Sequence, residues 1–229
     1  MSEKTDFETF LYISKNKYQI FVYDKNDLKN LYNKEININE EFEFKGLSKF
    51  LDENIYKIEK KVNNFVKDII LIIDDEKILN TNIKIKKKYE NQINQKYIEN
   101  NLIEIKDIFR ENYEDQIIMH MIIINHDANK NFLLNNENMS NNYLYLEVNF
   151  ISISNSFTFI FDKLLQNHQI KIRHYMSGNY IKSFFGDNAT ELSEMANKIN
   201  NGLNENEVKL VSKNSANKGF FEKFFQLFS

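Results

Sequence analysis

The sequence contains no cysteine, no proline and no tryptophan, and only five glycines among its 229 residues. Without cysteine, the chain forms no disulfide and offers no thiolate nucleophile or zinc–sulfur site, which fits a reducing cytoplasm. It also lacks a glycine-rich phosphate loop, a Walker pattern and a nucleophile elbow, so no familiar motif marks an enzyme. No apolar run approaches the roughly 20 residues of a membrane-spanning helix, and the first residues carry no signal-peptide pattern. We therefore expect a soluble, non-enzymatic protein that touches a membrane only from the side.

Charge and histidine placement exclude two further kinds of site. The net charge is −3, with acidic and basic residues interleaved, so no overall field attracts nucleic acid. None of the histidines has a ligand partner at metal spacing. His120 lies within an expected strand and His126 just after it, while His168 and His174 flank another. We therefore expect no catalytic residue, no cofactor, no metal site and no nucleic-acid partner.

The last eleven residues, 219–229, carry the strongest functional pattern. At about 100° per residue, their apolar side chains fall on one side of a helix and their polar ones on the other. The apolar group supplies the candidate membrane-binding residues: Phe220, Phe221, Phe224, Phe225, Leu227 and Phe228. Aromatic rings suit the headgroup boundary, so we expect a short amphipathic helix that lies in a membrane surface. The polar stretch 200–218 ahead of it has little to pack and is expected to act as a flexible tether.

Two other roles for this helix stay open. Its phenylalanines also suit a groove on a protein partner, where amphipathic helices commonly dock. Alternatively, the helix closes the core of its own domain. Both alternatives predict burial of the same rings against protein rather than lipid.

Hydrophobic periodicity predicts alternating strands and helices. A hairpin is expected from 10–13 and 19–23 around the turn 14–17, with a third strand at 35–39. Further strands are expected at 68–73, 78–85, 116–125, 144–153 and 170–174. Helices are expected at 47–66, 95–112, 156–166 and 188–200. This order predicts an α+β fold, with helices on one face of a mostly antiparallel sheet.

Charged clusters fall where ordinary surface roles explain them. Lys84, Lys86, Lys87 and Lys88 follow or alternate with Ile83 and Ile85, as on an exposed strand. They either mark a solvated edge that discourages sheet-to-sheet pairing, which we favour, or face anionic lipid. The pairs Asp74–Asp75 and Glu114–Asp115 stand at the ends of expected elements, where solvated turns explain them.

Several segments between residues 67 and 185 share their order and spacing with a bacterial family. Asp68–Ile73 follows a long helix, and the helix 95–112 comes next. His120-Met-Ile-Ile-Ile-Asn-His126 matches the family pattern H-h-I-P-x-x-Y, in which h is apolar. Glu147–Ser154 matches V-H-L-I-T-C-S, and Gln169–Ser183 matches G-L-x-V-D-Q-L-I-x-S-G-L-A-S-S. In these segments the chain resembles the bacterial cell-division protein FtsA, an actin-like membrane tether for the division ring.

The resemblance implies four regions. They are a partial actin-like portion at 1–66, an inserted strand-helix-strand-strand region at 67–185, a helix and polar linker at 186–218, and a membrane-targeting helix at 219–229. The family's nucleotide site is not matched. Its first phosphate loop, of G-T-x-K character, corresponds to Ser14–Lys17, where the glycine is missing. Its second, D-I-G-G-G-T, belongs after Phe185, where Gly186-Asp-Asn-Ala-Thr stands instead. We therefore expect no nucleotide binding.

The resemblance implies a reduced, FtsA-like, non-enzymatic adaptor in bacterial cell division. Residues 219–229 are expected to anchor it peripherally on the cytoplasmic side of the inner membrane. Residues 67–183 are expected to recruit other division proteins and to support self-association. Three alternatives stay open: a soluble interaction domain whose tail docks into a protein partner, a pilus-assembly adaptor that shares the inserted subdomain, and a small enzyme with an unrecognised site.

Overall fold

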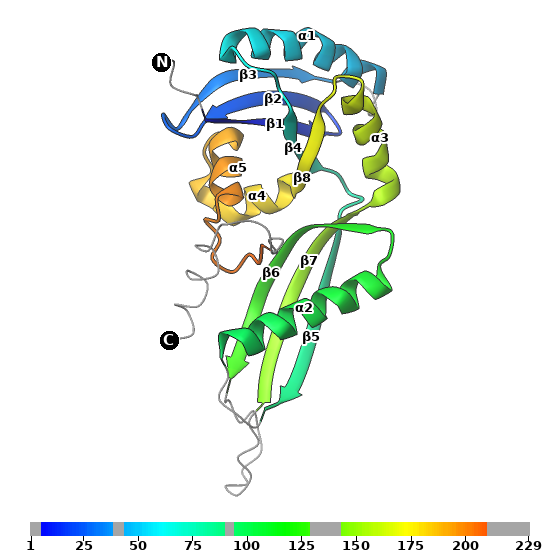
Figure 1. The fold of residues 1–229 in the computed structure, drawn as a ribbon, viewed down its shortest axis with the longest axis vertical. Coiled ribbons are helices and arrows are strands. Elements are labelled where there is room, and N and C mark those ends of the chain that lie inside the picture. The colour runs from blue at the N-terminus through cyan, green and yellow to red at the C-terminus, as the bar shows by residue number, and fades with distance from the viewer. Residues whose placement is uncertain (1–5, 39–43, 90–93, 129–142, 210–229) are drawn as a thin grey trace, which may run out of the picture. The chain divides into compact units, whose positions relative to one another are not determined.

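The chain forms two compact units, each built from two stretches of sequence. The computed structural model describes residues 6–38, 44–89, 94–128 and 143–209. Of these residues, unit 1 comprises those within 6–78 and 153–203, and unit 2 comprises those within 79–152 and 204–209. Figure 1 shows the elements of both units. These two units are defined by contacts in space, whereas the four ranges expected from the sequence were defined by a family resemblance.

Unit 1 is organised around a five-stranded mixed sheet in the order β3-β2-β1-β4-β8. β1 (Phe7–Ser14), β2 (Lys17–Asp24) and β3 (Lys29–Asn37) form an antiparallel meander. β4 (Asp68–Asp74) runs parallel to β1, and β8 (Lys171–Ser177) runs parallel to β4. The expected hairpin is confirmed, while the third strand begins well before the expected residue 35.

Helices cover both faces of this sheet. α1 (Phe44–Val62) and α3 (Asn155–Gln166) lie on one face, and α4 (Gly178–Phe185) and α5 (Leu192–Asn200) lie on the other (Figure 1). Neighbouring residues show the alternation: the Tyr175 hydroxyl bonds to Asp162 of α3, whereas Met176 joins the core under α4 and α5. The fold is α+β as expected. The prediction of helices on one face of a mostly antiparallel sheet, however, is wrong for unit 1. Its central strands contain the unbroken apolar runs Phe10–Ile13 and Ile69–Ile73, because both of their faces are buried.

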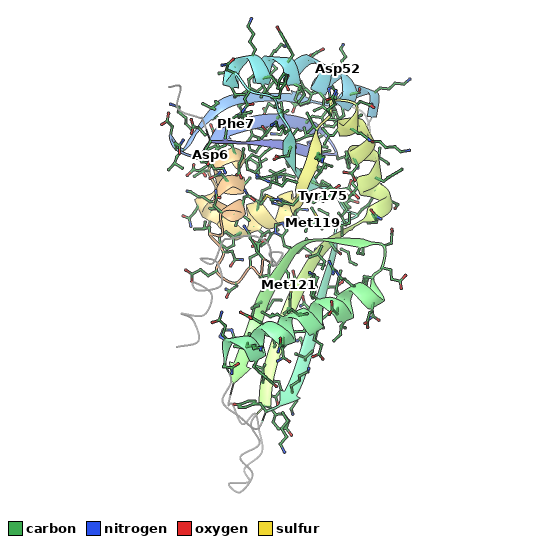
Figure 2. The ribbon with its side chains drawn as sticks, in the orientation of Figure 1. Asp6, Phe7, Asp52, Met119, Met121 and Tyr175 are labelled. Carbon is green, nitrogen blue, oxygen red and sulfur yellow. The ribbon has the colours of Figure 1, made fainter. Side chains whose placement is uncertain are left out.

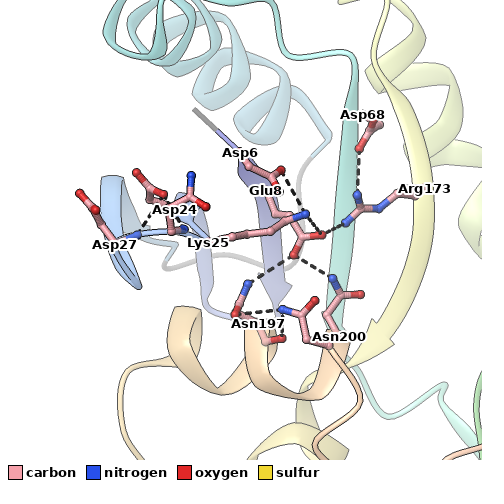
Figure 3. Close-up of polar contacts among 11 residues, drawn as sticks. Asp6, Glu8, Asp24, Lys25, Asp27, Asp68, Arg173, Asn197 and Asn200 are labelled. Atoms are coloured by element: carbon pink, nitrogen blue, oxygen red, sulfur yellow. Dashed lines mark hydrogen bonds and ion pairs between the residues drawn. The ribbon is translucent and has the colours of Figure 1, made fainter. Parts of the chain in front are cut away.

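A buried carboxylate joins α5 to the sheet (Figure 3). Glu8 on β1 is 5% exposed and accepts a 2.5 Å hydrogen bond from Arg173 of β8. Asn200 and Asn197 of α5 donate to its other oxygen at 2.8 and 3.4 Å, and Lys25 lies 3.5 Å away. A buried charge is stable only when it is paired and hydrogen-bonded, so these donors make burial of Glu8 possible.

The described part of unit 2 is a three-stranded sheet, ordered β5-β7-β6, with a helix packed on one face. In chain order its elements are β5 (Leu79–Lys88), α2 (Gln95–Asn112), β6 (Gln116–Ala128) and β7 (Tyr143–Ser154). β5 and β7 pair antiparallel, and β6 also runs opposite to β7 (Figure 1). α2 has the bounds that its periodicity predicts, and the Asn94 side chain caps it by accepting a hydrogen bond from the Tyr97 amide.

The core of unit 2 lies between α2 and the sheet. Its buried residues come from α2, β6 and β7: Ile98, Leu102, Ile105, Phe109, Met121, Ile123, Leu146, Val148 and Phe150. Met121 is labelled on β6 in Figure 2. The Phe109 ring stacks on Phe150 at 4.5 Å between centroids and on Tyr113 at 4.9 Å. One face of this sheet is therefore packed against α2.

Local backbone signals shift two boundaries from their expected places and add one helix. α1 ends at Val62 rather than at residue 66, because Asn63 takes a left-handed conformation with φ of 51°. Residues 178–185 form α4, a helix that the sequence analysis missed although the Ser177 side chain caps it. A short 3-10 helix, η1 (Gly186–Asn188), follows, so α5 begins at Leu192 instead of 188.

We expect Phe109→Ala to destabilise unit 2 by about 3–5 kcal/mol, because its fully buried ring would leave a cavity. Ile103→Ala on the same helix is the control, since that side chain is 47% exposed and should cost under about 1 kcal/mol. Hydrogen exchange of unit 2 amides during urea titration measures both, since the two units need not unfold together. Equal shifts for the two variants would contradict the core described above.

Candidate functional site

The predicted membrane-binding residues fall outside the described part of the chain. They are Phe220, Phe221, Phe224, Phe225, Leu227 and Phe228. Residues 210–218 of the expected tether also lie outside it. The described chain ends at Lys209, so the structure shows the residues that precede the tail and their contacts with unit 2.

The beginning of the expected tether is paired with β6. The Ile123 amide donates to the Asn206 carbonyl at 2.9 Å, and the Val208 amide donates to the Met121 carbonyl at 2.8 Å. Glu207 is buried and its carboxylate lies 2.7 Å from Nδ1 of His120, whose side chain is 1% exposed. The expectation that 200–218 has little to pack is therefore wrong for 204–208, which cover part of the outer edge of β6.

A cleft of about 780 Å³ opens in unit 1 where β1 and β4 end. The β1–β2 turn, the segment after β4, α3 and α4 all contribute to its wall. Its lining includes Ser14, Lys15, Asn16, Asp74, Asp75, Lys77, Phe157, Ile160, Asn179 and Lys182. The turn expected at 14–17 thus lies beside Asp74 and α4, a proximity that sequence spacing did not reveal.

The Asp74 carboxylate in this cleft is paired with other side chains of the protein. The Tyr12 hydroxyl donates to Asp74 at 2.9 Å, and the Lys182 ammonium lies 2.5 Å from the same carboxylate oxygen and 2.9 Å from the hydroxyl. Burial lowers the pKa of Lys182, but its hydrogen bonds to Asp74 and Tyr12 outweigh this and raise the pKa above its ordinary value. Interpreting Asp74 as part of a solvated turn is therefore wrong. A carboxylate held by a cation and a phenol is poorly placed to act as a general base.

The cleft depends on a close backbone approach at Gly178, the first residue of α4. A Cβ built there would lie 3.1 Å from Cβ of Asp74 and 3.2 Å from the Tyr12 ring. Only glycine fits this spacing without displacing a neighbour. Gly178 therefore lets α4 begin directly against the Tyr12–Asp74 pair.

A second surface is the face of the unit 2 sheet that α2 does not cover. Cross-strand partners on it are Lys84 with Glu147, Lys86 with Tyr145 and Lys88 with Tyr143. The strand alternation expected for the lysine cluster is confirmed, since Lys84, Lys86 and Lys88 are exposed. Lys87 lies on the opposite side of the strand, where it pairs with Glu104 of α2. We call the exposed lysines and the two tyrosines the basic face.

Other candidate chemistry receives little support. Within the described ranges, no group of three or more His, Asp or Glu side chains is placed to hold a metal ion. His168 lies 3.5 Å from Asp52, which Figure 2 labels. Glu114 and Asp115 are exposed in the turn before β6, as expected. Among the helices that the structure describes, none combines the length and apolarity needed to cross a membrane.

Comparisons with known proteins give only distant likenesses. No family model matches the chain, and no curated protein matches it. A solved PilM–PilN type IV pilus biogenesis complex is similar at a TM-score of 0.46 and 9% identity, covering 77% of this chain and 49% of that one. The cytoplasmic domain of EpsL, an inner-membrane component of the type II secretion system of Vibrio cholerae, gives 0.37 and 7%, covering 75% and 56%.

A third solved structure, from Bacteroides thetaiotaomicron, is a protein of unknown function with an actin-like ATPase fold. Its TM-score is 0.31 at 14% identity, covering 80% of this chain and 57% of that one. The chain spans about half the length of these structures. None is described as a cell-division protein, so FtsA stays an interpretation from the sequence. We base no conclusion about function on likenesses of this strength.

Gly178→Ala is expected to destabilise unit 1 by about 1–3 kcal/mol, because the added methyl overpacks against Asp74 and Tyr12. Gly46→Ala in α1 is the matched control. A Cβ there meets its nearest atom at 3.8 Å, so alanine should stabilise the helix by about 0.4–1 kcal/mol. Urea denaturation measures both changes, and a stabilised Gly178→Ala variant would contradict the close approach.

Proposed function

We propose that this protein is a non-enzymatic adaptor in bacterial cell division, attached peripherally to the cytoplasmic side of the inner membrane. The observation that carries the proposal is the amphipathic pattern of residues 219–229, which follow a segment fixed to unit 2. A helix with apolar rings on one side and polar groups on the other binds at an interface without crossing it. Recruitment of other division proteins is then the role of the two folded units.

The attachment of 204–208 to β6 supports this arrangement. Two backbone hydrogen bonds and the buried His120–Glu207 contact fix the chain immediately before the tail. Residues 209–218 are the only sequence between that point and the amphipathic segment, and as a flexible chain they would span about 15–20 Å. A membrane-bound tail would therefore keep unit 2 close to the lipid surface.

The described side chains also favour an adaptor over an enzyme. The carboxylate in the cleft of unit 1, Asp74, is already held by Lys182 and Tyr12. The turn at 14–17 that lines the same cleft contains no glycine.

Cell division is the finer part of the proposal and rests on the FtsA-like segments between residues 67 and 185. A fluorescent fusion in the native host tests it, with enrichment at the division site as the expected result. A fusion that concentrates at pilus assembly sites would favour the pilus-assembly adaptor. A fusion that stays in the cytosol, bound to one protein through its tail, would favour the soluble interaction domain.

We expect Phe221→Glu combined with Phe225→Glu to move the protein from the membrane to the soluble fraction. Full burial of one phenylalanine is worth about 1.5–3 kcal/mol, and interfacial insertion gives part of that, so the anchor is weak and two charges suffice to release it. Membrane fractionation measures the change. Gln226→Glu with Ser229→Glu is the control, because it adds the same charge on the polar side of the helix. If both doubly charged variants pelleted like the wild type, the tail would not be the anchor.

We expect Mg-ATP to leave the melting temperature unchanged at millimolar concentration, and we expect no hydrolysis. A nucleotide at a hundred times its Kd stabilises a folded protein by about 2.7 kcal/mol, which raises the melting temperature by several degrees. Differential scanning fluorimetry detects such a shift, with an active actin-like ATPase as the positive control. An increase of several degrees would show that a nucleotide site exists despite the missing glycines.

A further inference from the structure

The basic face is a flat strip on unit 2 that carries cations and aromatic rings together. Alternation along β5 places Lys84, Lys86 and Lys88 away from α2, with about 6.6–6.8 Å between successive lysines. On β7, Tyr143 and Tyr145 share this side, while Leu144 and Leu146 are buried. The strip therefore presents positive charge along β5 and half-buried rings along β7.

The ring contacts fix the position of one ammonium group. Lys86 Nζ lies 4.4 Å from the centre of the Tyr143 ring and 5.1 Å from that of Tyr145. A hydrogen bond with Tyr145 raises the pKa of Lys86 above its ordinary value, so this lysine stays charged at neutral pH. The Lys84 side chain, which is 70% exposed, is paired with Glu147 at 3.2 Å. Lys86 and Lys88 thus carry most of the charge available to a ligand.

Three observations select the class of partner. Residues 204–208, which precede the tail in sequence, are bound to β6, so the chain leaves for the tail from the unit that carries the basic face. Side chains that combine an apolar body with a polar tip, such as lysine and tyrosine, suit a membrane interface. The Lys86 ammonium lies over both tyrosine rings, so the strip presents a cation together with apolar ring surface. Charge complementarity then points to anionic headgroups.

We propose that the basic face is a second membrane contact, which binds anionic lipid headgroups while the tail inserts. This inference rests on the proposed membrane attachment and adds the kind of lipid that the protein selects. Linking two weak contacts makes the second one intramolecular, so their combined affinity exceeds that of either alone. Salt should weaken this contact, because it screens exposed charges.

Vesicle binding by the full chain tests the proposal. Lys86→Gln with Lys88→Gln should weaken binding to an equal mixture of phosphatidylglycerol and phosphatidylcholine by about tenfold or more, since each lysine near an anionic surface contributes about fivefold. Binding to phosphatidylcholine alone should not change. Lys57→Gln with Lys60→Gln, at exposed positions on α1, is the control for net charge and should bind like the wild type.

A single introduced cysteine gives a direct measure of contact, because the chain contains no other cysteine. Lys88→Cys, labelled with a polarity-sensitive fluorophore, should shift to shorter wavelength on the mixed vesicles. Lys57→Cys, labelled in the same way, should not shift.

The outcomes separate this inference from the tail anchor. If Lys86→Gln with Lys88→Gln bound the mixed vesicles like the wild type, while Phe221→Glu with Phe225→Glu failed to bind, the second contact would be overturned and the anchor would stand. An acidic protein surface would then be the partner to seek for the basic face. Loss of binding in the lysine variant alone would support the second contact and contradict the tail anchor.

Discussion

Parallel strands cannot be joined by a tight turn, and the course of this chain follows from that constraint. β4 lies between β1 and β8 and runs parallel to both. The connection from β1 to β4 therefore passes through the meander and α1, and the connection from β4 to β8 passes through unit 2 and α3. Unit 2 is thus an insertion into a crossover, and the cleft of unit 1 forms where β1 and β4 end and their connections leave the sheet.

Buried or half-buried carboxylates then fix the surrounding segments, each through a partner that is far away in sequence. Glu8 is bound by Arg173, Asp74 by Lys182, and Glu207 by His120. Removing one partner of such a buried pair is strongly destabilising, because the polar group left behind loses the contact that offsets its burial. These pairs join α5 and α4 to the sheet of unit 1, and the segment before the tail to the sheet of unit 2.

Periodicity predicted the elements whose burial is one-sided. α2 has the bounds that its apolar spacing indicates, and the lysine alternation on β5 indicated an exposed face. The expectation of helices on one face failed for the unit 1 sheet, although the continuous apolar runs Phe10–Ile13 and Ile69–Ile73 are the pattern of strands buried on both faces. Periodicity also missed the pairing of 204–208 with β6, since backbone hydrogen bonds leave no side-chain pattern. His120 was the available signal, because a polar group within an apolar strand needs a buried partner.

The two candidate surfaces, the tail and the basic face, differ in how far the sequence predicts them. The apolar side of 219–229 follows from sequence alone, whereas the basic face requires the register that sets Lys86 beside Tyr145. Register depends on pairing between distant strands, and Asp74 likewise meets Lys182 only through the parallel sheet. Sequence therefore indicated which residues are exposed, and the fold determined which of them act together.

Charge distribution gives the proposed attachment an orientation. The chain carries a net charge of −3, so an anionic membrane does not attract it as a whole. Stable peripheral attachment usually combines two signals, such as an apolar anchor and a basic patch. Here the apolar signal follows in sequence the 204–208 segment, which is bound to β6, and the basic signal lies on β5 of the same sheet. If both contact lipid at once, the basic face must point toward the membrane, and α2, which packs against the other side of that sheet, must point away from it.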